Sequence, residues 1–138
     1  MTESNGRRAR SIYVRKCFLW LGAAAIAIGV LVLVYRGPGR AVVRGHVGDV
    51  AAAMLVYAAI AAVFSSTRSH VRALVTLGIA TAIEVGQAWW HTSSTLGDLT
   101  IGDTCDPWDI FAYAIGVGVA LVWERIAVAR CAACAPLS

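Results

Sequence analysis

The longest uncharged run limits this chain more than any other feature. Residues 17–35 contain no Asp, Glu, Lys or Arg over 19 residues, and a helix of that length rises about 28 Å, close to the thickness of a bilayer's hydrocarbon core. Apolar residues make up 59% of the sequence and charged residues 14%, against about 45–50% and 25% in soluble domains. A soluble domain of 138 residues could not bury so much apolar surface. The sequence therefore predicts helices surrounded by lipid.

Three further apolar segments follow the first, and no internal repeat or second domain is visible. We predict an all-α fold: a four-helix transmembrane bundle with a polar outer loop between the third and fourth helices. The first segment ends at Arg36-Gly37-Pro38 rather than at a small-residue cleavage site, so we expect a retained helix and not a secretory signal. The membrane domain covers residues 17–126, between a basic N-terminal tail (1–16) and a C-terminal tail (127–138), with spans at about 17–35, 49–64, 73–90 and 107–123.

The basic residues are divided unevenly between the two sides of such a bundle. The N-terminal tail, the second loop and the C-terminal tail together carry nine of the 12 Lys and Arg residues, and the first loop carries three. The positive-inside rule then places both termini in the cytoplasm and the third loop, which has no Lys or Arg, outside. We expect a multi-pass membrane protein. Nucleic-acid binding is not expected, because no basic patch interleaved with aromatic residues lies on a soluble domain.

One carboxylate stands inside an otherwise apolar helix. Glu84 falls about 9 Å below Trp89 and Trp90, whose rings are typical of the membrane interface. A carboxylate in lipid costs at least about 2.5–3.5 kcal/mol unless it finds a partner or water, so Glu84 should point into the bundle. Gln87 and His91 follow at i+3 and i+7 and share its helix face.

A second polar face begins the fourth helix, where Asp109 and Tyr113 are spaced i and i+4. Asp49 begins the second helix on the same predicted side of the membrane. We predict a polar pocket formed by Asp49, Glu84, Gln87, Asp109 and Tyr113. Its carboxylates could pair with Tyr113, share a proton, or meet nearby groups: Arg36, Arg40, Arg44, His46 and His91.

Two interpretations of Glu84 stay open. It could belong to an outward-facing pocket that binds a head group, sugar or ion or relays a proton, or to a buried hydrogen-bond network that fixes helix register. Asp106 and Asp109 are also explained by the start of a helix at Pro107. Asp98 and Asp103 are interpreted as solvated turn residues.

The sequence predicts no metal site and no cofactor. It has no His pair at ligand spacing, and Cys131-Ala-Ala-Cys134 has no second cysteine pair to complete a site. It also has no nucleophile in a recognisable setting and no glycine-rich phosphate loop. These features favour a non-enzymatic role.

Several short motifs resemble a known family. They are Gly48-Asp49 to Tyr57, Ile83-Glu84-x-x-Gln87, Leu96-Gly97, Gly102-x-Thr104 and Asp109-x-x-Ala112-Tyr113-x-x-Gly116. Together they are similar to domain-of-unknown-function family 2809, small bacterial four-helix membrane proteins that distantly resemble the VanZ-like proteins linked to glycopeptide resistance. The resemblance covers about residues 12–126. It implies a bacterial inner-membrane protein and no particular activity.

Three functions are compatible with these features. The first is an envelope-associated protein that binds a lipid head group or cell-wall precursor at the predicted pocket. The second is a small membrane enzyme or proton-coupled carrier that uses Glu84 and Asp109 as an acid/base pair. The third is a helical subunit or assembly factor that acts through its Ala/Gly faces. The expected partners are membrane lipid and other membrane proteins or a second copy of the chain.

Overall fold

A computed structural model describes residues 2–90 and 107–133, with side chains for residues 12–86 and 108–130. Four long helices account for most of these residues, and the regular structure described is helical throughout, which confirms the all-α prediction. The predicted polar loop, residues 91–106, lies outside the described residues. The elements are α1 (Thr2–Val34), α2 (Arg40–Val42), the π-helix η1 (Val43–Val47), α3 (Gly48–Val63), α4 (Ser69–Trp90) and α5 (Pro107–Ala133).

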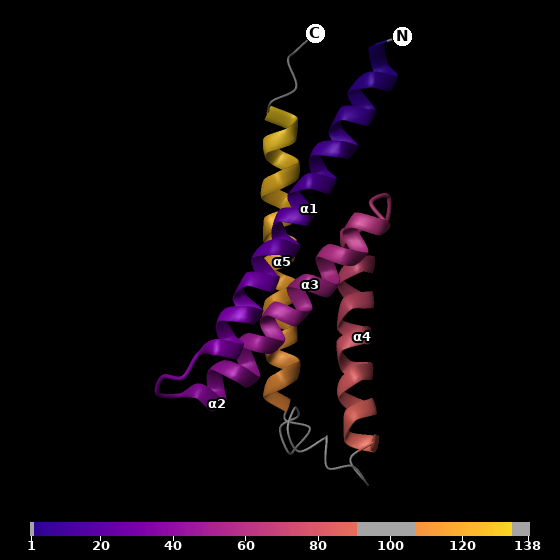
Figure 1. The fold of residues 1–138 in the computed structure, drawn as a ribbon. Coiled ribbons are helices and arrows are strands. Elements are labelled where there is room, and N and C mark those ends of the chain that lie inside the picture. Colours follow the sequence, from indigo (N-terminus) through magenta and orange to yellow (C-terminus); the bar gives the residue numbers. More distant parts are fainter. Residues whose placement is uncertain (1, 91–106, 134–138) are drawn as a thin grey trace.

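Helix α3 lies at the centre of the bundle and packs against α1, α4 and α5 (Figure 1). Helix α1 also packs against α5, and α4 packs against α5. The beginning of α1, the turn between α3 and α4 and the end of α5 lie at one end of the bundle, here called the terminal end. The turn after α1, the end of α4 and the beginning of α5 lie at the opposite end, here called the far end.

Within the part of the chain whose side chains are described, three helical segments are long and apolar enough to cross a membrane: Ile12–Val34, Arg40–Val63 and Trp108–Arg130. Large apolar side chains cover much of the outer surface of the bundle, including Trp20, Leu31 and Leu74. Water-soluble monomers rarely expose apolar surface on this scale, whereas a helical bundle in lipid does so throughout. The structure therefore supports membrane spans in three helices, and a fourth span through α4 stays a prediction.

The helices extend beyond the predicted spans. Helix α1 already begins at Thr2, because the basic segment before residue 17 has no proline and contains four helix-favouring arginines. Helix α5 continues to Ala133, ten residues past the predicted end of the span at residue 123. Helix α4 begins at Ser69, so Arg72 lies on a helix and not in the predicted loop.

A tight turn joins α1 to the second long helix. Gly39 adopts a left-handed conformation with φ 74°, which a residue without a Cβ adopts at little cost. The Arg44 guanidinium donates to the Leu33 carbonyl at 2.8 Å and so satisfies one of the free carbonyls at the end of α1. Segments α2, η1 and α3 run on from this turn without a break, and the second helix therefore starts nine residues before the predicted position 49.

Small residues bring the helices close together. A Cβ added to Gly22 of α1 would lie 3.7 Å from the Cβ of Ala58 on α3, so the two helices touch at this level. Close approach of this kind is the main source of helix association where lipid surrounds the bundle. The buried core combines small residues such as Ala53, Ala61 and Ala120 with a few large ones, among them Phe18, Leu21 and Tyr57.

Candidate functional site

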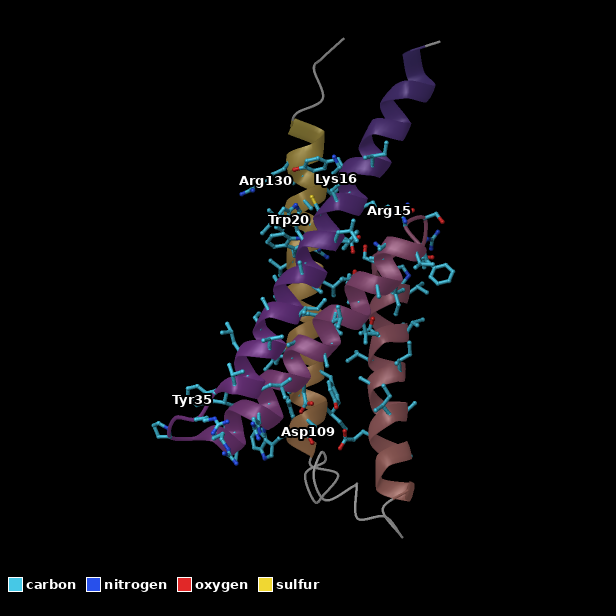
Figure 2. The ribbon with its side chains drawn as sticks, in the orientation of Figure 1. Arg15, Lys16, Trp20, Tyr35, Asp109 and Arg130 are labelled. Carbon is cyan, nitrogen blue, oxygen red and sulfur yellow. The ribbon has the colours of Figure 1, made fainter. Side chains whose placement is uncertain are left out.

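Three carboxylates converge at the far end of the bundle, each from a different helix. Asp49 lies in the first turn of α3, Glu84 in the last third of α4 and Asp109 in the first turn of α5. The Tyr113 hydroxyl, one turn after Asp109, donates a hydrogen bond of 3.1 Å to Oε2 of Glu84. The Asp49 side chain interacts with Asp109, Tyr113 and Glu84. We call these four residues the acidic cluster; Asp109 marks its place in Figure 2.

Two carboxyl groups of the acidic cluster lie side by side. The Asp49 and Asp109 carboxyl groups lie close enough to influence each other, and two ionised carboxylates side by side repel and offer acceptors only. Such a pair of acids is able to hold one proton between its two members, as in other sites where two carboxyl groups lie side by side. Glu84 lies near this pair and accepts from Tyr113. The cluster can thus hold, exchange or release a proton, or accept hydrogen bonds from a cationic ligand.

The predicted basic partners whose side chains are described form no ion pair with the acidic cluster. Arg44 is occupied by the end of α1, and Arg36 and Arg40 are exposed to the surroundings. His46 is half-buried, and its Nδ1 has no hydrogen-bond partner. Among the side chains that the structure describes, no arginine, lysine or histidine forms an ion pair with the acidic cluster.

The structure brings together four of the five residues predicted for the pocket. The fifth, Gln87, lies on α4 one turn after Glu84, but its side chain is outside the described residues. His91 also lies outside them. Within residues 12–86 and 108–130, no three His, Cys, Asp or Glu side chains are grouped as a metal site. A function for the acidic cluster stays a prediction at this point.

A second polar network lies near the terminal end and was not predicted. Arg72 of α4 and Glu124 of α5 form a buried ion pair, with side chains 4% and 10% exposed. Nη2 of Arg72 donates to one oxygen of Glu124, and the Tyr57 hydroxyl of α3 donates to the other. Both carboxylate oxygens are thus satisfied by donors from two other helices. We call these three residues the Arg72 network.

The guanidinium of Arg72 also contacts two other elements, the end of α3 and the middle of α1. Its Nη1 lies 3.4 Å from the carbonyl oxygens of both Phe64 and Ser65, at the end of α3. Its Cζ lies 5.6 Å from the ring centroid of Phe18 on α1, within the range of a cation–π contact. One side chain therefore contacts all three of the other long helices or their ends, which points to a structural role for Arg72.

A signal for this network is present in the sequence. Arg72, Thr76, Ala80 and Glu84 are spaced by four residues and share one face of α4, and the structure buries the first three. The predicted span begins at residue 73 and so leaves Arg72 in the second loop, since a basic residue at the edge of an apolar run is typical of a span boundary. An apolar segment follows Glu124 as well, and it could have shown that α5 continues.

Comparison with known proteins identifies the family. Residues 39–117 match a family described as "Protein of unknown function (DUF2809)". The chain belongs to the DUF2809 family. This confirms the resemblance drawn from the sequence motifs, although the matched segment is shorter than residues 12–126. It includes the whole acidic cluster and Arg72 but ends before Glu124. No curated protein and no solved structure matches the chain.

Proposed function

We propose that this DUF2809 protein is an integral, four-span protein of the bacterial inner membrane whose acidic cluster binds the protonated amine of a lipid head group or cell-wall precursor. The convergence of Asp49, Glu84 and Asp109 beside the Tyr113 hydroxyl carries this proposal. These groups offer many acceptors, and no basic side chain is described as paired with them. An ammonium group supplies the positive charge and the N–H donors that such a set of acceptors lacks.

The depth of the cluster suits a head group. Glu84 lies six residues before the end of α4 at Trp90, and Asp109 is the third residue of α5. At 1.5 Å per residue the carboxylates lie within about 9 Å of the helix ends. With these helix ends at the membrane surface, as the proposal has them, this depth falls in the interfacial zone, in which lipid head groups and interfacial side chains meet. A ligand could therefore reach the cluster without crossing the hydrocarbon core.

The binding test compares lipids that differ in their amine. Native mass spectrometry of the detergent-solubilised chain should show phosphatidylethanolamine, which has N–H donors, bound more tightly than phosphatidylcholine, which has none. Glu84→Gln should weaken the binding of phosphatidylethanolamine about tenfold or more, since a hydrogen bond to a charged group is lost. The matched control is Arg40→Gln, which changes an exposed residue at the same end of the bundle and should leave this binding unchanged. Equal affinities of Glu84→Gln and the wild type would contradict the proposal.

We further propose that both termini are cytoplasmic, so that the acidic cluster faces outward. Nine of the 12 Lys and Arg residues belong to segments at the terminal end, and three lie near the turn after α1. Leaving out the buried Arg72 still gives eight against three, and the side with more basic residues is normally cytoplasmic. A green fluorescent protein fused to the C-terminus should fluoresce in bacterial cells, and alkaline phosphatase fused there should be inactive. The reverse result would overturn this orientation.

Proton exchange is the second candidate, and the close approach of the Asp49 and Asp109 carboxyl groups favours it. A group that shares one proton between two acids can pass that proton to a substrate or across a boundary. In liposomes that contain the protein and a pH-sensitive dye, an imposed membrane potential should then drive proton uptake. Loss of uptake in Asp109→Asn, with ethanolamine-lipid binding unchanged, would favour this candidate over the first.

A further inference from the structure

The exposed charged side chains described at the terminal end are of one sign. Within the part of the chain whose side chains are described, they are all basic. The acid described at this end, Glu124, is buried and paired with Arg72, so it does not offset them. The exposed basic residues come from α1, the α3–α4 turn and α5: Arg15, Lys16, Arg68, Arg125 and Arg130.

Helices α1 and α5 meet at this end in a defined register. The indole N–H of Trp123 on α5 donates to the Cys17 carbonyl of α1 at 3.0 Å. This bond joins the two helices next to Lys16, and Trp20 follows Lys16 on the same face of α1 one turn deeper in the bundle. Arg130 lies two turns beyond Trp123 on the same face of α5. Figure 2 shows Lys16 and Arg130 at the terminal end, with Trp20 deeper.

The two tryptophans at this contact between α1 and α5 are largely exposed, although their side chains are large and apolar. Trp20 is 72% exposed and Trp123 is 42% exposed. Indole rings gather where acyl chains meet head groups, and Lys and Arg gather just beyond them, at the level of the phosphates. From the terminal end inward, this surface therefore has two cations followed by two indole rings. A phospholipid has its groups in the matching order, with the phosphate first and the glycerol and acyl carbonyls deeper.

We propose that the α1–α5 seam, defined by Lys16, Trp20, Trp123 and Arg130, binds the head group of an anionic phospholipid. Lys16 and Arg130 contact the phosphate oxygens, and the two indole rings line the glycerol region. Charge complementarity favours this occupant. Two exposed cations, with no exposed acid described nearby, attract a head group of net negative charge more strongly than a zwitterionic one. The site lies at the opposite end from the acidic cluster and does not depend on what that cluster binds.

The test is a titration of the full-length chain with phosphatidylglycerol, followed by native mass spectrometry, with phosphatidylcholine as the reference lipid. The wild type should prefer phosphatidylglycerol. Each of Lys16→Gln and Arg130→Gln should weaken its binding about fivefold, and the double variant about 20–30-fold. These positions are exposed, so the variants should fold, and the single variants give a separate reading if the double variant does not purify.

The matched control is Arg36→Gln/Arg40→Gln, which removes two exposed cations from the far end. It should leave phosphatidylglycerol binding within about twofold of the wild type. Wild-type affinity in Lys16→Gln/Arg130→Gln would overturn the proposal. An equal loss in the control would overturn it as well, because the preference would then reflect net charge and not a site. Glu84→Gln should not change this binding, which separates the seam from the acidic cluster.

Discussion

Replacing Arg72 by Met is expected to destabilise the bundle by about 3–5 kcal/mol. The substitution keeps a long side chain but leaves the buried carboxylate of Glu124 without its cation. It also removes the donor to the end of α3 and the contact with the ring of Phe18. Breaking a buried ion pair on one side costs more than the pair contributes, because an uncompensated charge stays inside. The Tyr57 hydroxyl alone cannot neutralise it.

Unfolding of the purified variants by sodium dodecyl sulphate, followed by circular dichroism, measures this effect. The double variant Arg72→Met/Glu124→Met should recover much of the lost stability, since neither charge is then left alone. Tyr57→Phe is the mild member of the series, because it removes one hydrogen bond to Glu124 and should cost about 1.5–3 kcal/mol. Equal midpoints for Arg72→Met and the wild type would show that Glu124 is not held by Arg72.

The second large effect is expected at Gly116, where α5 crosses α3. A Cβ at this position would lie 2.5 Å from the Val50 carbonyl oxygen and 2.8 Å from the Cβ of Ala53. The first of these atoms belongs to the backbone and the second is attached directly to it, so neither can move away by a side-chain rotation. Gly116→Ala should therefore push the two helices apart and cost about 1–3 kcal/mol. The same shift would move Asp109 and Tyr113 away from Asp49, one to two turns along.

Gly118→Ala is the control for the glycine effect. It lies two residues further along the same helix, and nothing lies within 4 Å of a Cβ added there. That substitution should be neutral, or stabilising by up to about 1 kcal/mol, because alanine favours the helix more than glycine does. The detergent-unfolding midpoints of the two variants should therefore move in different directions. A Gly116→Ala variant as stable as Gly118→Ala would contradict the close crossing.

The acidic cluster was predictable to a large extent. Glu84 had to face inward because a carboxylate in lipid is costly, and the spacing of Asp109 and Tyr113 placed both on one face of their helix. The structure places these residues together with Asp49. The sequence did not decide among the partners of Glu84, since tyrosine, arginine and shared protons were all within reach of its side chain. In the structure the Arg44 guanidinium donates to the Leu33 carbonyl at the end of α1, so it is not the partner of Glu84.

The Arg72 network was not predictable from the same reasoning. Its residues come from α3, α4 and α5 and are separated by 52 and 67 positions along the chain. Each charge alone resembles the polar boundary of a span, and only the pairing shows that both are interior. The predicted spans begin after Arg72 and end before Glu124 for the same reason, whereas helices α4 and α5 include both residues.

Uncharged runs of nearly bilayer length determined by themselves that this protein is built of helices, because in lipid each backbone N–H and carbonyl must be satisfied within its own segment. The inward direction of Glu84 followed from the cost of exposing a carboxylate to hydrocarbon. Only the tertiary structure decided which charges meet, where each helix stops and how closely α3 and α5 approach at Gly116. These depend on side-chain contacts between distant segments, and local sequence carries no record of such contacts.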